Sequence, residues 1–424
     1  MFTTLKNAWK ITELRKKILF TLLLVVIYRL GCFIPVPGVN PAYIASMVGK
    51  YNILGFLNLM TGGSFGDFTW LAMGISPYIN ASIIMQLLTV AIPALERLQK
   101  EGEEGRKKIS QLTRLLGIVF ALVMSIGIIL GMGSGAVVSS DIIPVWLSYL
   151  TIGLVITSGT AFLIWLGEQI SEVGIGNGIS FIIFAGIVSR IPSAAMSIGS
   201  MIGNGVITFW LIPVIIVFIL LVVAGLTYVD LGERRVPVQY AKRVVGRKMY
   251  GGQSTHIPMR VNANGVLPLI FAMTLMQFPG MIAQFWPQSS FYLWYQKWLG
   301  TGTAIYFLIY LLLIIGFSYF YTAITFNPIE MSKNLQQNGG FIPGIRPGRS
   351  TSDYMARISN RLTFFSAIFS AVIAAVPTLF SSIIGSTGAA FGATSLLIMV
   401  SVALETSKTL EAQITMRHYK GFLK

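Results

Sequence analysis

The chain has 424 residues with a formal net charge of +16, and 54% of its residues are hydrophobic while 11% are charged. Its mean hydropathy of +0.73 is too high for a water-soluble domain, and apolar residues spread along the whole length exclude a protein with a single membrane anchor. The composition therefore predicts a polytopic membrane protein built from helices, because a helix satisfies its own backbone polar groups inside lipid.

Ten apolar windows follow one another along the chain. Crossing a bilayer core of about 30 Å takes roughly 17 to 25 helical residues, so we predict ten transmembrane helices. The fifth window is the least regular, because Arg190 and Pro192 interrupt it. The windows are 18–34, 70–92, 112–132, 145–166, 179–198, 209–229, 265–285, 304–326, 362–384 and 391–404.

Lysine and arginine are segregated between alternate polar segments. The two termini and every second segment hold 27 of the 31, when Arg114 at the edge of the third window is included. The opposite segments hold three, Lys50, Arg190 and Lys297, and Arg29 lies inside the first window. Because basic residues stay on the cytoplasmic side of a membrane, this asymmetry predicts that both termini are cytoplasmic. For Arg29 itself, a snorkelling side chain and a functional charge are both open.

A short apolar run lies between the first two windows and ends at Gly62 and Gly63. It is too short to cross a membrane. Irregular backbone at membrane depth survives only against protein or a water-filled cavity, so a re-entrant half-helix is one interpretation. The other interpretation is an amphipathic helix on the outer surface.

The second and seventh windows are polar for helices that face lipid, with Asn80 and Gln86 in one and Gln277 in the other. Such residues line a hydrated interior in some membrane proteins and form interhelical hydrogen bonds in others. The sequence leaves both interpretations open.

Isoleucines occur at a spacing of four residues in two windows, as Ile75 with Ile79 and Ile179 with Ile183. Each pair lies on one face of a helix. Isoleucine at this spacing is typical of ordinary packing, and it is also typical of a hydrophobic constriction that gates by dewetting.

Catalytic groups are missing from the apolar windows. His256 and His418 lie outside them, and the chain has neither an HExxH motif nor a GxxxxGK[ST] phosphate loop. A secondary transporter needs a substrate or ion site near the membrane midplane, and no acidic residue lies in any window. We therefore expect no enzymatic activity, no metal and no cofactor in this chain.

Six motifs resemble the bacterial SecY family, the pore subunits of the general protein translocation channel, in both order and spacing. One local departure is FGATS at 391–395, where the family often has GGTS. The six motifs are GCFIPVPG at 31–38, ASIIMQLL at 81–88, EGEEGRKKIS at 101–110, GIGNGIS at 174–180, QSTHIP at 253–258 and PGIRPG at 343–348.

The resemblance implies an all-α membrane protein of two five-helix halves, residues 1–200 and 201–424, related by a pseudo-twofold axis in the membrane plane. It also implies an hourglass-shaped pore with a ring of apolar side chains at the waist. That ring would consist of Ile75, Ile79, Ile179, Ile183, Ile270 and Ile398.

The resemblance further implies a plug, about residues 53–67, which fills the outer funnel of the idle channel. This favours the re-entrant interpretation of the short apolar run. A lateral gate between windows two and seven would release apolar segments to lipid near Asn80, Gln86 and Gln277. The plug residues would be Ile53, Leu54, Phe56, Leu57, Leu59, Met60, Gly62 and Gly63.

Two long polar loops, 230–262 and 327–361, are rich in basic residues. Val236 and Val238 alternate with polar residues before a basic turn, which predicts a hairpin. The charges are either topogenic or part of a docking surface, and their position at the far end of a hairpin favours docking. In the family these loops bind the ribosome and the SecA motor. The docking residues would be Arg235, Lys242, Arg243, Arg247, Lys248, Arg346 and Arg349.

The function that the resemblance implies is that of the central channel-forming subunit of a protein translocase in the bacterial plasma membrane. It would conduct unfolded secretory polypeptides and pass transmembrane segments into lipid. The partners that we expect are SecE, SecG, the SecA ATPase, SecDF, the ribosome, signal peptides, nascent polypeptides and membrane lipids.

Overall fold

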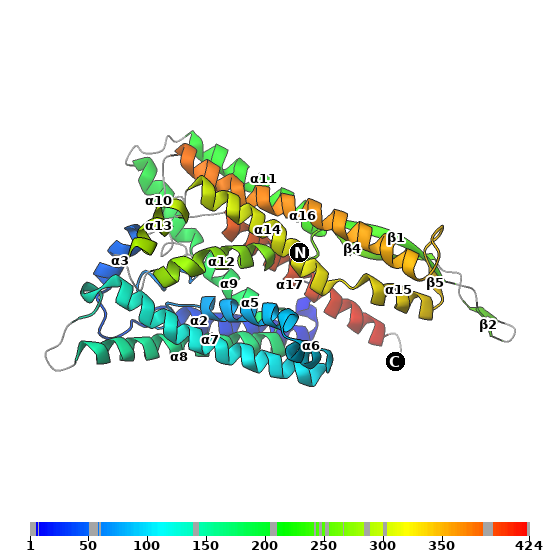
Figure 1. The fold of residues 1–424 in the computed structure, drawn as a ribbon, viewed down its shortest axis with the longest axis horizontal. Coiled ribbons are helices and arrows are strands. Elements are labelled where there is room, and N and C mark those ends of the chain that lie inside the picture. The colour runs from blue at the N-terminus through cyan, green and yellow to red at the C-terminus, as the bar shows by residue number, and fades with distance from the viewer. Residues whose placement is uncertain are drawn as a thin grey trace.

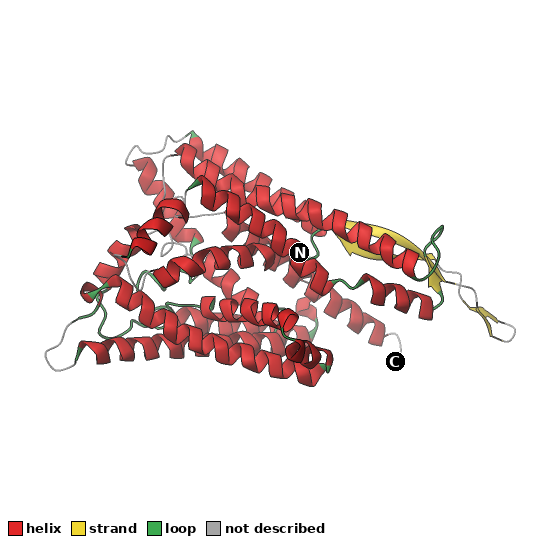
Figure 2. Cartoon of the chain, viewed as in Figure 1, coloured by secondary structure: helices red, strands yellow, loops and turns green. Residues whose placement is uncertain are grey.

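The structure is a computed structural model that forms a long helical bundle with β-strands at one end (Figures 1 and 2). The residues that it describes are 6, 8–50, 58, 61–138, 144–203, 210–240, 243–245, 248–250, 254–265, 267–283, 289–299, 303–384 and 393–421.

The first part of the chain forms a bundle in which α7 packs on both α5 and α8. Its elements are α2 (Thr12–Gly31), α3 (Pro41–Lys50), α5 (Ser76–Ala91), α6 (Pro93–Lys100), α7 (Glu103–Met132), the short 3-10 helix η1 (Ser134–Ala136), α8 (Val145–Val173), α9 (Gly178–Val188) and α10 (Ile191–Gly203).

The second part of the chain forms a bundle in which α14 packs on both α12 and α16. Its helices are α11 (Leu211–Leu231), α12 (Leu267–Ala283), α13 (Ser290–Leu299), α14 (Ala304–Thr325), α15 (Pro328–Gln337), α16 (Arg349–Ile384) and α17 (Ala393–Gly421).

Every predicted window overlaps at least one of these helices. Among the described residues, five helices are long and apolar enough to span a membrane, and α5 with α6 makes a sixth if this pair, bent by 100°, is one span. The structure therefore has several apolar helices, as the sequence predicts, while the count of ten remains a prediction.

Two windows have helical bounds that differ from the prediction. The second was expected to be helical from residue 70, but residues 61–75 form buried turns and α5 begins only at Ser76, where Pro77 occupies the first turn of the helix. The fifth was expected to be one helix over 179–198, but α9 ends at Val188 and α10 begins at Ile191. Pro192 fits the first turn of α10, because a proline there lacks only an N–H that would be unpaired.

The strands lie at one end of the helical bundle (Figure 2). They are β1 (Glu233–Tyr240), β2 (Arg243–Val245), β3 (Lys248–Tyr250), β4 (Ser254–Arg260) and β5 (Gly340–Phe341). β1 pairs with β4 in an antiparallel hairpin, with Val236 opposite Ile257, and β5 adds to the other edge of β1. The predicted hairpin is thereby confirmed, and both long loops contribute to one sheet.

Candidate functional site

Five of the six predicted ring residues meet in one hydrophobic cluster. We call this the isoleucine cluster and define it by all of its members, which come from α5, α9, α12 and α17. Buried Ile183 and Ile398 lie at its centre, and Ile79, Ile179 and Ile270 pack against them. The members are Ile79, Ile179, Ile183, Phe184, Ile187, Ile270, Ile398 and Val402. Both parts of the chain therefore supply side chains to the same apolar contact.

Ile75 is the ring residue that the structure leaves out of this cluster. It is buried in a neighbouring cluster with Leu71 and Leu163, and Ile79 and Ile179 pack against both clusters. The reason is its position one residue before α5, where the chain leaves a turn whose Gly74 has a φ of +56°. Ile75 therefore lies beside the isoleucine cluster.

Three members of the cluster were missed at the sequence level, namely Phe184, Ile187 and Val402. Ile187 lies four residues after Ile183, and Val402 lies four residues after Ile398. The same helical spacing that singled out the isoleucine pairs could have found both, because a helix repeats its face at this interval.

The position of α9 is fixed by the glycine-rich turn before it. The side-chain oxygen of Asn177 accepts hydrogen bonds from the backbone N–H groups of Ile179 and Ser180 at 3.1 and 3.3 Å. This is an N-cap, which satisfies donors that a helix start leaves unpaired. A Cβ at Gly178 would lie 2.0 Å from the carbonyl oxygen of Gly167, so only glycine allows α9 to approach α8 this closely.

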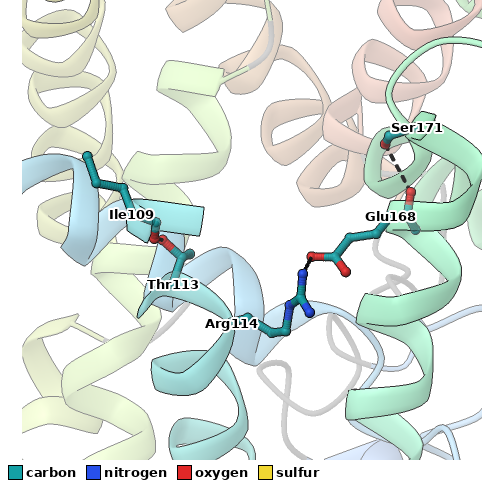
Figure 3. Close-up of polar contacts among 6 residues, drawn as sticks. Ile109, Thr113, Arg114, Glu168 and Ser171 are labelled. Carbon is teal, nitrogen blue, oxygen red and sulfur yellow. Dashed lines mark hydrogen bonds and ion pairs between the residues drawn. The ribbon is translucent and has the colours of Figure 1, made fainter. Parts of the chain in front are cut away.

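An ion pair joins α7 and α8. Figure 3 shows the guanidinium of Arg114 on α7 facing the carboxylate of Glu168 on α8. The two side chains are 45% and 21% exposed. Solvent screens the two charges at this exposure, so the ion pair contributes little to the stability of the fold. One turn further on, the hydroxyl of Ser171 accepts a hydrogen bond from the N–H of Gly178 at 2.9 Å and so ties α8 to the start of α9.

Two of the three predicted gate residues have described side-chain contacts, and both residues lie on α5. Asn80 is buried, and its side-chain amide donates to the sulfur of Met124 on α7 at 3.7 Å. Gln86 donates to the hydroxyl of Ser82 within α5 at 3.3 Å, and the side chain of Gln277 lies outside the described residues. Between the two parts of the chain, α12 contacts α7. Asn80 thus acts as an interhelical hydrogen-bonding residue in this conformation.

The described end of the predicted plug is turns rather than a half-helix. Residues 51–57, 59 and 60 lie outside the described part, which includes the predicted plug residues Ile53, Leu54, Phe56, Leu57, Leu59 and Met60. The predicted helix is wrong for residues 61–67, because Gly62 and Gly63 have φ values of +66° and +99° that favour turns.

This turn segment is held by side chains of the first bundle. Arg29 donates to the carbonyl oxygen of Gly62 at 3.4 Å. The hydroxyl of Tyr28 donates to the backbone carbonyl oxygen of Thr61 at 3.5 Å. A Cβ on Gly63 would lie 2.9 Å from a terminal nitrogen of Arg190. The guanidinium of Arg29 therefore contacts the protein backbone. A side chain that only snorkels to the membrane surface would not need this contact.

Three of the predicted docking residues have described side chains, and all three lie in the loops that form the sheet or follow it. Arg346 and Arg349 are exposed, and Arg235 pairs with Glu233 at 2.8 Å at the surface. Lys242 and Arg247 lie outside the described residues, and only the backbones of Arg243, in β2, and Lys248, in β3, are described.

The sheet packs on α15 and α16 through a small core of its own. Val236 and Val238 on β1 are buried against Leu335 on α15 and Met355 on α16. This apolar face packs described parts of the two loops against each other.

A polar network connects the base of the hairpin to α17. The carboxylate of Asp230 accepts hydrogen bonds from the amide of Asn262 and, at 2.8 Å, from the hydroxyl of Ser401. The ammonium of Lys408 donates to the backbone carbonyl of Asp230 at 3.0 Å. Burial, together with the charge of Arg260, holds the pKa of Lys408 below its usual value, and the Asp230 charge opposes that shift. The network ends three residues from Ile398, a central member of the isoleucine cluster.

Comparison with known proteins identifies the family. The sequence profile of the SecY family matches residues 69–407, which is most of the chain. The chain belongs to the SecY family. Two relatives, each named protein translocase subunit SecY, come from Halalkalibacterium halodurans and Streptomyces scabiei and are 45% and 42% identical. Each alignment covers the whole of both chains.

Solved structures share the SecY fold. A protein-conducting channel matches with a TM-score of 0.67 and 21% identity over 93% of this chain and 91% of the other. A SecY channel whose plug domain is described as stabilising the closed state and maintaining a membrane seal matches with a TM-score of 0.66 and 22% identity, at the same coverage. Sec61 in a canine ribosome-channel complex matches with a TM-score of 0.62 and 20% identity, also at that coverage.

Proposed function

We propose that this chain is the channel-forming subunit of a bacterial protein translocase, and that unfolded polypeptides pass through the isoleucine cluster. The observation that carries the proposal is this cluster, to which helices of both parts of the chain contribute. Membership of the SecY family gives the cluster its functional context. The chain would itself perform no chemistry, and a partner would supply the driving force.

The cluster would act as the constriction of the closed channel. Ile183 is 6% and Ile398 is 2% exposed, so solvent barely reaches these two side chains in the conformation described. Branched apolar side chains offer water no hydrogen bond, and such a constriction resists ions by dewetting. An extended polypeptide would part the two bundles, and the same side chains would then close around its backbone.

The plug and the gate would complete the channel. We propose that residues 53–67 cover the outer funnel, anchored by the turn at Gly62 that Arg29 contacts. We propose that α5 and α12 border a lateral gate, with α7 beside them on the same seam because α12 contacts it. Apolar segments would leave through this gate because each Leu, Ile, Phe or Val contributes about 0.3 to 0.6 kcal/mol at mid-bilayer.

The two loops would form the docking platform for the ribosome and the SecA motor. Arg346 and Arg349 are exposed, and they follow β5, whose sheet packs on α15 and α16. Contacts between the two guanidinium groups and ribosomal RNA phosphates would be salt-dependent. SecE, SecG and SecDF are proposed as further partners, and co-purification in mild detergent tests each of them.

The strand end would be cytoplasmic and the membrane would be the bacterial plasma membrane. The asymmetry of 27 basic residues against three supports this orientation. The two halves, 1–200 and 201–424, would be related by the pseudo-twofold axis that the family implies.

The proposal is tested by reconstituting the chain with SecE, SecA and ATP in vesicles. We expect an unfolded precursor to become protected from protease, and a precursor locked in its folded state to arrest. Arg346→Glu should reduce protection about tenfold or more, while Arg357→Gln, which removes an exposed charge on α16, should leave it nearly unchanged. Equal import of folded and unfolded precursors would contradict the channel, and full activity of Arg346→Glu would contradict docking at that residue.

A further inference from the structure

The short helix α13 has an apolar face that protein does not cover. It lies at the end of the bundle opposite the strands, beside the ends of α12 and α14 (Figure 1). Trp294 is 51% and Trp298 is 45% exposed on this face, and Phe291 and Leu293 are exposed with them. Tyr295, four residues after Phe291, is 2% exposed and lies on the side of the helix that protein covers. Apolar residues therefore occur on both the covered and the exposed sides of α13, and the exposed ones include two tryptophans.

Lipid is the partner whose chemistry this face fits. Tryptophan is enriched at membrane interfaces, because its ring is apolar while its N–H needs a polar partner. Lys297 lies on the same face with its ammonium 5.8 Å from the centre of the Trp298 ring, as expected for a lysine whose charge reaches the headgroups. The face continues onto α14, where Ile305 and Leu308 are also exposed. Apolar residues of a predicted span thus adjoin α13.

The inner face of α13 is fastened to α12. The hydroxyl of Tyr295 donates a hydrogen bond to the backbone carbonyl of Met276 at 2.8 Å. A Cβ at Gly280 would lie 2.9 Å from ring atoms of Tyr295, so the ring lies directly against the α12 backbone. Pro279 lies inside α12 between these two contact points and removes one backbone donor from the helix there. Tyr295 therefore contacts the part of α12 where a backbone hydrogen bond of the helix is missing.

We propose that α13 is a membrane-surface anchor whose exposed tryptophans lie in the interface of the outer leaflet. Tyr295 would then hold the end of α12 at the same depth in the membrane as α13. The anchor itself is independent of the channel function. If α12 borders the lateral gate as proposed above, the outer end of the gate is then held at a fixed level in the lipid while the cytoplasmic end can move.

The anchor is tested by depth-dependent quenching in vesicles that contain the full translocase complex. An environment-sensitive fluorophore is placed on a cysteine at Leu293 in a Cys32→Ala background. A cysteine at Leu220, in the middle of α11, serves as the bilayer-core control, and one at Lys333 on α15 serves as the aqueous control. Lipids with a spin label near the headgroup should quench Leu293 at least twofold more than lipids with a label deep in the chain, and Leu220 should show the opposite order.

Two outcomes of this experiment would overturn the anchor. Quenching at Leu293 no greater than at Lys333 would mean that the face is in water. Emission in the blue without quenching by either lipid would mean that a protein covers the face.

The coupling to α12 is tested with Tyr295→Phe, which removes the hydroxyl and keeps the ring. Hydrogen exchange of the amides at 276–283 should become severalfold faster, while lipid quenching at Leu293 stays unchanged. Trp294→Ser with Trp298→Ser should reduce the quenching and leave the Tyr295 contact. Unchanged exchange in Tyr295→Phe would overturn the coupling, whether or not the complex transports precursors.

Discussion

Two properties of the isoleucine side chain suit the seal that is proposed for the cluster. Their branched Cβ restricts the first side-chain torsion in a helix, so Ile183 and Ile398 present fixed apolar surfaces to each other. At the same time each side chain gains only small dispersion contacts with its neighbours, and these are easily exchanged for contacts with a passing chain. The residue type is therefore consistent with the proposed seal and with its reversible opening.

A polar side chain in the cluster should therefore open a path for ions. Ile183→Asn introduces an amide that finds no partner among apolar neighbours, and leaving such a group unsatisfied costs about 1 to 3 kcal/mol unless water enters. Ion leak through vesicles with the idle channel should rise about tenfold or more, because about 1.4 kcal/mol is a factor of ten.

The matched control is Ile183→Leu, which keeps volume and apolarity and should stay close to the original leak. A leak in Ile183→Asn that equals that of Ile183→Leu would show that the seal lies elsewhere in the molecule.

Among the elements, α17 links the base of the hairpin to the isoleucine cluster. Asp230 ends α11, where the helix dipole disfavours a negative charge, yet its carboxylate is retained by Asn262 and Ser401. The bond to Ser401 reaches the helix that carries Ile398. We infer that a force applied to the hairpin would reach α17 through these hydrogen bonds as well as through apolar contacts.

Asp230→Ala should loosen α17 without removing the platform. Both carboxylate hydrogen bonds are lost, and leaving the buried hydroxyl of Ser401 unpaired costs about 1 to 3 kcal/mol. Hydrogen exchange in α17 around Ile398 should accelerate, and the SecA-driven import rate should fall severalfold. Glu233→Gln is the control, since Glu233 makes only a surface ion pair with Arg235, worth about 1 kcal/mol or less. Equal behaviour of the two variants would argue against transmission through Asp230.

For the whole molecule, the apolar windows and the alternation of apolar residues predicted where helices and strands form. Helices formed at all ten windows because apolar windows have one stable backbone form in lipid, and Val236 and Val238 predicted their strand by alternation. The resemblance to the SecY family then brought Ile270 and Ile398 into the candidate ring, which spacing alone did not predict.

What the sequence could not predict are features fixed by tertiary contacts. The turns at Gly62 and Gly63 depend on close packing with Arg29 and Arg190, which lie far away in the sequence. Ile75 lies in the neighbouring cluster because a buried turn precedes α5, and the contact of Asn80 with α7 follows from packing of whole helices. Local patterns carry no information about such long-range contacts.

The central claim is that polypeptide crosses the membrane through the isoleucine cluster, and site-specific cross-linking of a stalled secretory chain tests it most directly. Cysteines are placed one at a time at Ile79, Ile183 and Ile270, with Leu220 on the exposed side of α11 as control. The account predicts adducts with the stalled chain at the three cluster positions and none at Leu220. No adduct at any of the three positions would contradict it.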